Sequence, residues 1–309
     1  MGTVRRSLIA VVALVTLACG AASVQAQTLA LAYASGDTYR YHLHVTSDGT
    51  IAFGYAPQAF KLDMTASETV SVHSIDAQGI ADVSVSVTNV TSKISINGSQ
   101  GSSSSTTNLP KVPVPAIELK IAKDGRVLSI NGSSLSGNFM LGLGAGGNLV
   151  SAVLPDKPVK LGETWSKDYD QANPAGTGSV HVTTISKYVR NETIKSINAA
   201  VVETTSAARF DLTMDMSGLM PKPVIGASPP AGMTSPPLPN DLQGVTLKGT
   251  VTSVTTSWID LRGHRMIKTL MNAKSDLTMS FVMAAGSSVP IGMGSFESKA
   301  TQTVDLEPA

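Results

Sequence analysis

Two histidines, His42 and His44, flank Leu43 in a stretch of alternating residues. Residues two apart on a strand share a face, so both imidazoles could meet one metal ion. A third ligand would have to come from a neighbouring strand, and His73 and Asp63 are the candidates. Two exposed histidines on the polar face of an edge strand are the simpler interpretation, and we expect neither a metal nor another cofactor.

The other catalytic patterns are weak. A hydrolytic triad needs a serine, a histidine and an acid together in space, and the sequence has no G-x-S-x-G motif around a serine. Acids such as Asp168, Asp170, Glu192 and Glu203 form no recognisable pair for glycoside chemistry. We therefore assign no catalytic residue and expect a protein that is not an enzyme, with a hydrolase kept as an alternative.

A glycine-rich segment, Gly142–Gly147, fits the dinucleotide pattern G-x-G-x-x-G. That pattern works only between a strand and a helix whose N-terminus holds the phosphates. The apolar residues that follow end at Pro155, which leaves too little chain for the helix. We interpret the segment as an apolar loop and expect no nucleotide cofactor.

Methionine is unevenly distributed, because nine of the twelve methionines lie after residue 210. Thioether side chains form adaptable apolar surfaces, so this region could line a cavity for a lipid-like ligand. The candidate cavity residues are Met214, Met216, Met279, Met283 and Trp258. A methionine-rich core without a ligand is the alternative.

The elements that would position these residues are strands. Alternation over 69–75 and 80–90 brackets a turn at Asp76–Gly79, and a second hairpin joins 117–121 to 127–130 through Asp124 and Gly125. The sequence predicts an all-β, antiparallel fold of curved sheets or half-open barrels. Further strands are predicted over 179–188, 199–205, 210–216 and 245–261.

Two polar or proline-rich stretches separate the strands. Residues 98–108 are mostly serine, glycine and threonine with no apolar side chain, which predicts a flexible exposed loop. Residues 221–239 contain seven prolines, which indicates a disordered loop or, alternatively, a lid or a binding loop.

A weak internal repeat organises the chain. Gly36-Asp37-Thr38-Tyr39 and Gly162-Glu163-Thr164-Trp165 share the order glycine, acid, threonine, aromatic. This repeat predicts two related β sub-domains, 27–154 and 155–309, the second of which contains the loop 221–239. One continuous sheet that curves across both halves is an equally physical outcome.

Residues 1–26 read as a secretory signal peptide. Arg5 and Arg6 precede the short apolar stretch 8–18, and small residues lead to a cleavage site after Ala26. Lipidation at Cys19 is the minor alternative. We expect an exported protein of the periplasm or the extracellular space.

The net charge and the length of the apolar runs exclude two classes of partner. A formal charge of +1 excludes a nucleic-acid binder that relies on a basic field, and no apolar run of about 20 residues follows residue 30. We expect no nucleic acid and no transmembrane segment beyond the signal. The oligomeric state stays open.

The stretch Leu154–Trp165 reads P-x-x-P-V-x-x-G-E-T-W from Pro155 onward. We call the two repeat motifs, Gly36–Tyr39 and Gly162–Trp165, the first and second openers. Together with the export signal and the first opener, the stretch resembles an uncharacterised family of exported all-β envelope proteins of bacteria. A more distant resemblance is to envelope lipoprotein carriers that hold acyl chains in a half-open barrel. The resemblance implies an envelope protein with no catalytic residues to transfer.

Three functions follow as hypotheses. The first is a non-enzymatic envelope protein that binds an apolar or amphipathic ligand between curved sheets. The second is a structural or adhesion-like module whose partner is another envelope protein, and the third is a hydrolase.

Overall fold

The computed structural model describes residues 26–53, 57–98, 101–108, 116–131, 153–172, 176–215, 242–283 and 293–307. All regular structure in these ranges is β-strand. None of these residues belongs to a helix of the length and apolarity needed to cross a bilayer.

Twelve strands of the described residues form one sheet in which every pair is antiparallel. The order across the sheet is β6-β5-β3-β2-β1-β12-β11-β10-β9-β8-β7, and β4 pairs with β3. The strands are β1 (Thr38–Phe53), β2 (Gln58–Ile75), β3 (Ala81–Gly98), β4 (Gly101–Asn108), β5 (Ile117–Ile121), β6 (Val127–Asn131), β7 (Thr164–Ala172), β8 (Gly176–Ile194), β9 (Ile197–Asp215), β10 (Leu242–Asp260), β11 (Met266–Met283) and β12 (Met293–Leu306).

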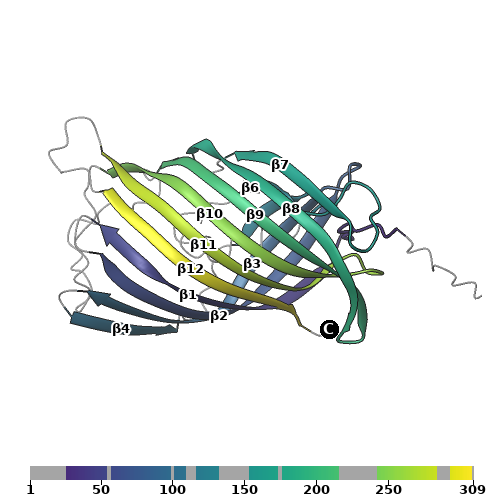
Figure 1. Ribbon diagram of the computed structural model, residues 1–309, viewed down its shortest axis with the longest axis horizontal. Coiled ribbons are helices and arrows are strands. Elements are labelled where there is room, and N and C mark those ends of the chain that lie inside the picture. Colours follow the sequence, from purple (N-terminus) through teal and green to yellow (C-terminus); the bar gives the residue numbers. More distant parts are fainter. Residues whose placement is uncertain are drawn as a thin grey trace, which may run out of the picture.

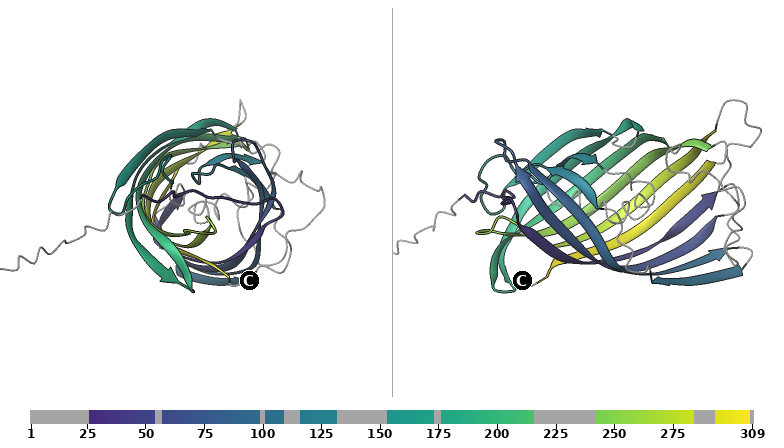
Figure 2. Two further views of the ribbon diagram at one scale, coloured as in Figure 1. Left: turned by 90° about the vertical axis from the view of Figure 1, so that its right-hand side faces the viewer. Right: turned by 180° about the vertical axis from the view of Figure 1, so that it is seen from behind.

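The sheet curls into a nearly closed, barrel-like shape (Figures 1 and 2). β1 pairs with β12 from Tyr41–Leu306 to Phe53–Gly294. This pairing joins the first strand to the last one. β6 and β7 are the two terminal strands of the sheet order. The predicted all-β, antiparallel fold with a curved, half-open sheet is confirmed.

Both predicted hairpins are present. In the turn between β2 and β3, the carboxylate of Asp76 accepts hydrogen bonds from the backbone N–H groups of Gln78 and Ile80, each at 2.9 Å. The turn between β5 and β6 contains Asp124 and Gly125, as the sequence indicates. The later predicted strands are also present, within longer strands of up to 19 residues.

One loop prediction is wrong. Residues 101–108 form β4, which pairs with β3 from Gly98–Gly101 to Thr91–Asn108. Serine and threonine side chains do not prevent a ladder when a neighbouring strand offers its free backbone groups, which is the case here. The signal peptide 1–25, the segment Gly142–Gly147 and the loop 221–239 lie outside the described residues.

The two faces of the sheet differ in chemistry. Along β1, Leu43 and Val45 are buried on the inward face, whereas His42, His44 and Thr46 are exposed on the outward face. The same alternation runs through the other long strands. The inward residues form most of three apolar clusters. The largest cluster joins β1, β2, β3, β5 and β6 to β9, β10, β11 and β12.

The two predicted openers have the same local structure. Before β1, Gly36 donates to the Val72 carbonyl at 2.9 Å, and Val72 donates back to the Asp37 carbonyl at 2.9 Å. The Asp37 carboxylate also accepts from the Ala34 N–H at 3.0 Å. These bonds fix the point where β1 enters the sheet.

The second opener repeats this pattern before β7. Gly162 donates to the Tyr188 carbonyl at 2.7 Å, and Tyr188 donates to the Glu163 carbonyl at 3.0 Å. The Glu163 carboxylate accepts from the Lys160 N–H at 2.8 Å. The strands of each half are contiguous in the sheet and meet at β1 and β12. A division between residues 154 and 155 stays a prediction, because all strands share one sheet.

The first opener gives a pH-dependent prediction. The hydroxyl of Tyr39 donates to the Asp37 carboxylate at 2.6 Å, and this bond lowers the pKa of Asp37, with a further contribution from the Ala34 N–H. A lowered carboxyl pKa stabilises the fold above the unfolded value of about 3.9, and the contribution is lost as pH falls through the folded pKa.

We expect Asp37→Asn to lower Tm by about 2 °C at pH 7, and by less below about pH 4. Thermal unfolding followed by circular dichroism measures both values. Asp48→Asn, at an exposed carboxylate of β1, is the control. An equal Tm loss at pH 7 and pH 3 contradicts the prediction.

Candidate ligand-binding site inside the sheet

The segment before β1 crosses one end of the barrel-like sheet (Figure 2). Gln27 forms an antiparallel bridge with Val159, with N–H to O distances of 2.8 and 2.9 Å. Leu31 then donates to the Lys123 carbonyl at 2.7 Å, in the turn between β5 and β6. Ala32 donates at 2.8 Å to a carbonyl in the turn between β10 and β11. The segment therefore ties three parts of this end together.

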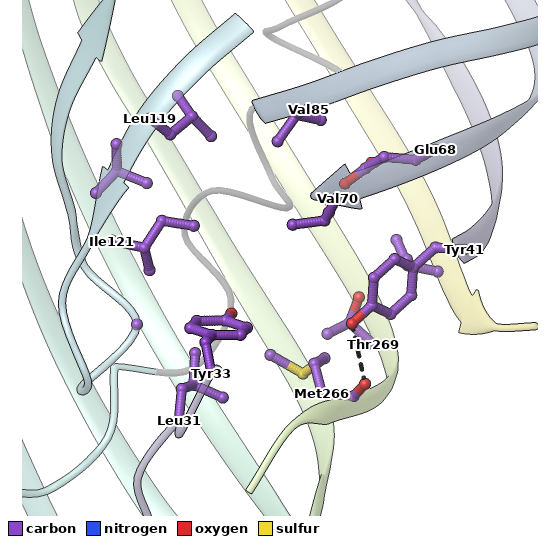
Figure 3. Close-up of a pocket in the computed structure, with 13 residues that line it drawn as sticks. Leu31, Tyr33, Tyr41, Glu68, Val70, Val85, Leu119, Ile121, Met266 and Thr269 are labelled. Carbon is purple, nitrogen blue, oxygen red and sulfur yellow. Dashed lines mark hydrogen bonds between the residues drawn. The ribbon is translucent and has the colours of Figure 1, made fainter. Parts of the chain in front are cut away.

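A pocket of about 80 Å³ lies directly behind this segment, inside the sheet (Figure 3). One water needs about 10–15 Å³ on this measure, so the pocket has room for a small group and a few carbons. Its lining comes from the crossing segment, β1, β2, β3, β5, β6, β11 and β12. The lining residues are Leu31, Tyr33, Tyr41, Glu68, Val70, Val85, Leu119, Ile121, Gly125, Val127, Met266, Thr269 and Val304.

Few polar groups reach this apolar pocket. The Tyr41 hydroxyl donates to the Met266 carbonyl at 3.2 Å (Figure 3). Burial raises the pKa of Tyr33 to about 12, and the negative charge of Glu68 adds to the shift. Burial also raises the pKa of Tyr41 well above its ordinary value. Both phenols are therefore neutral donors at physiological pH, and Glu68 brings the one carboxylate of the lining.

The apolar inner wall continues beyond the pocket toward the opposite end. Val85 and Val87 of β3 are half-buried, and Ile94, farther along the same strand, is 38% exposed. Phe60 of β2 and Phe296 of β12 stack at 5.4 Å between ring centroids, and both are half-buried. Side chains of this type are usually covered in a closed core. Their partial exposure shows that the inner wall has accessible apolar surface.

Side chains rather than ladder bonds connect the terminal strands β6 and β7 in the described part of the chain. The Asp124 carboxylate lies 2.7 Å from the Arg126 Nε and 3.7 Å from the Lys167 Nζ of β7. The Arg126 guanidinium also lies 5.5 Å from the centre of the Tyr169 ring on β7. This group of residues joins the two edges next to the crossing segment.

Three of the predicted cavity methionines, Met214, Met279 and Met283, lie at one end of strands β9 and β11, on either side of β10. Met279 is half-buried and packs against the cluster of Leu212, Leu247 and Leu277. Met214 and Met283 lie on β9 and β11, but their side chains, like the whole of Met216, fall outside the described residues. Met279 does not belong to the lining of the pocket described above.

Trp258, the fifth predicted cavity residue, lies on the face of the sheet opposite the pocket. It pairs with Val201 and Lys268, and the Lys268 ammonium lies 5.7 Å from the centre of its ring. Its neighbour Thr269 pairs with Ser257 and lines the pocket, so strand alternation places Trp258 on the opposite, outward side. There Trp258 is buried against the hairpin of β8 and β9. Its proposed role in ligand binding stays a prediction.

The two histidines of β1 do not meet. His44 Nε2 contacts the Asp63 carboxylate at 3.0 Å, and His73 contacts Glu118 at 3.5 Å. His42 instead lies opposite Asp305 and Ser67 in the ladders. Within the described ranges, no group of three or more potential ligands is arranged to hold a metal.

One residue of β2 marks the pocket in the sequence. Ala66, Glu68, Val70 and Val72 share one face of β2, so Glu68 is an acid at a position where the alternation predicts an apolar residue. Tyr33 had no such signal, because it belongs to the crossing segment rather than to a strand.

No family model and no curated protein matches the chain. Two solved structures show a partial likeness. One, determined in a study of lipid–protein interactions in lipovitellin, is 10% identical with a TM-score of 0.46; the match covers 89% of this chain but only 25% of that one. The other, an outer membrane channel from Pseudomonas putida F1, is 8% identical with a TM-score of 0.30 and coverage of 90% and 97%.

Proposed function

We propose that the protein is an exported envelope protein that binds an apolar or amphipathic ligand against the inner wall of its barrel-like sheet and catalyses no reaction. The observation that carries the proposal is the combination of an accessible apolar inner wall with a charged outer wall. Export is supported by the signal-like residues 1–26.

Ion pairs cross neighbouring strands of the outer wall. Lys248 of β10 lies 3.1 Å from Asp211 of β9, and His181 of β8 lies between two carboxylates of β7 at 3.0 and 3.4 Å. All of these side chains are about half exposed or more. Such a wall suits water, whereas a sheet that spans a bilayer presents an apolar band to lipid.

The inner wall has the opposite character. A protein in water rarely leaves accessible apolar surface of this kind without a partner that covers it. Ligand pockets are mostly apolar with a few convergent polar groups, and the pocket beside Tyr33, Tyr41 and Glu68 fits that description. The enclosed volume of about 80 Å³ holds only one end of a long ligand. The rest would lie along the half-exposed wall of β3.

The test uses N-phenyl-1-naphthylamine, an uncharged apolar dye whose fluorescence rises in apolar surroundings. We expect saturable binding to the purified protein. Val85→Phe fills the pocket with a larger side chain, because Val85 lines it, and should weaken dye binding at least about tenfold.

Val254→Phe is the matched control, because Val254 is an outward valine of β10 that is 51% exposed. It should leave dye affinity unchanged. Absence of saturable dye binding, together with no lipid in mass spectra of the purified protein, would refute the proposed function. If Val85→Phe and Val254→Phe weakened dye binding equally, the dye would bind outside the pocket that Val85 lines.

A further inference from the structure

Glu68 is placed by its register inside the barrel-like sheet. It pairs with Tyr41 of β1 on one side and with Val87 of β3 on the other. The inward face of β2 around it carries Ala66 and Val70, both of which are buried. The carboxylate is therefore built into an apolar wall, where a charge is costly unless polar or charged groups interact with it.

The described residues that line the pocket with Glu68 are apolar or carry neutral hydroxyl groups. The Tyr41 hydroxyl donates a hydrogen bond to the Met266 carbonyl. Burial raises the pKa of the Tyr33 phenol, and the charge of Glu68 adds to that shift. The positive charge of Arg265 lowers the pKa of Tyr41 slightly against the effect of burial, but its guanidinium lies 3.5 Å from the Asp260 carboxylate. Glu68 is thus the one residue with a charged group in the described lining of the pocket. A carboxylate accepts up to four hydrogen bonds, so a ligand donor can add to the interactions that Glu68 already makes.

The charge of Glu68 selects between ligand headgroups. A carboxylate or phosphate brought into this pocket would face Glu68 across a medium of low dielectric, which strengthens the repulsion of like charges. An ammonium or hydroxyl group would instead donate to the carboxylate, and charge-assisted bonds of this kind are the stronger ones. The volume of about 80 Å³ suits such a headgroup and its first carbons.

We propose that the pocket at Glu68 is a headgroup site for long-chain amphipaths that carry a cationic or hydrogen-bond-donating group, and that it rejects anionic amphipaths. The site rests on the proposed function, since it names the class of ligand for the same inner wall. The headgroup lies beside Glu68, Tyr33 and Tyr41, and the chain follows Val85 and Val87 along β3.

The experiment compares dodecylamine with laurate as competitors of bound N-phenyl-1-naphthylamine. The two have chains of equal length, and at pH 7 the first is a cation and the second an anion. For the unmodified protein, dodecylamine should displace the dye at a concentration at least about tenfold lower than laurate. In Glu68→Gln that preference, measured between the two competitors on the same variant, should fall to about threefold or less.

Glu297→Gln is the matched control, because Glu297 is an exposed, outward glutamate of β12. It should leave the preference for the amine intact. Equal displacement by both competitors, a preference for laurate, or an unchanged preference in Glu68→Gln would each overturn the headgroup site. Dye binding would persist in those cases and leave the proposed function standing. Failure of the dye to bind would remove both.

Discussion

A Gly249→Ala variant is expected to lose at least about 4 kcal/mol of unfolding free energy, or to accumulate as unfolded chain. Gly249 lies in β10, between β9 and β11, with a φ of 139°. A Cβ at this position would lie 2.1 Å from the Asp276 carbonyl oxygen and 2.9 Å from the Leu277 Cα. Both atoms belong to the backbone of the paired strand and cannot move without opening the ladder.

The loss is large relative to the total stability of most domains, which is about 5–15 kcal/mol. A glycine with positive φ inside a long strand gives the local bend that a closing sheet needs, and a side chain removes that bend. Urea unfolding followed by tryptophan fluorescence measures the difference. Where Gly249→Ala yields no folded protein, the absence of a cooperative transition is itself the expected result.

Gly79→Ala separates the clash of the added Cβ with a neighbouring strand from the backbone strain of a positive φ. Gly79 has a φ of 79° in the turn between β2 and β3, and a Cβ there would have no atom within 4 Å. This control carries only the backbone cost of about 1–2 kcal/mol. Equal losses in the two variants would show that backbone strain alone acts at Gly249, and that β10 yields to the added carbon.

Strands and hairpins could be predicted because their signals are local. The alternation over 80–90 and the turn at Asp76–Gly79 are both contained within about a dozen residues, and the structure places β2 and β3 accordingly. The length of β9 was underestimated because the buried Ser206 lies between the two predicted strands 199–205 and 210–216. Buried hydroxyls weaken the contrast between the two faces on which the prediction depends.

Closure of the sheet could not be predicted, because it depends on pairs far apart in sequence. Tyr41 meets Leu306, and nothing near either residue indicates the other. The same applies to Leu31, which reaches Lys123 across the end of the sheet. The candidate pocket needs both contacts, so a sequence search for a methionine-lined cavity could not find it. Glu68 alone was marked by its position in the alternation.

The second large effect is expected where the terminal strands meet. Asp124 is 5% exposed in the turn between β5 and β6, and it contacts Arg126 of the same turn and Lys167 of β7. Asp124→Ala removes the carboxylate that Arg126 and Lys167 share, and it leaves an empty space beside these two cations. Breaking a buried pair in this way costs about 3–5 kcal/mol, and the partial exposure of Arg126 places the loss near 3 kcal/mol.

Asp156→Ala tests whether burial makes the difference, because Asp156 contacts the same Lys167 ammonium at 2.5 Å but is 75% exposed. Exposed pairs contribute only about 0–1 kcal/mol, so this variant should unfold almost as the unmodified protein does. Hydrogen exchange should also be faster along β7 in Asp124→Ala alone, since the contact between Asp124 and Lys167 joins that edge to the turn between β5 and β6. Equal unfolding free energies and equal exchange in the two variants would mean that other contacts, such as Arg126 on Tyr169, hold β6 beside β7.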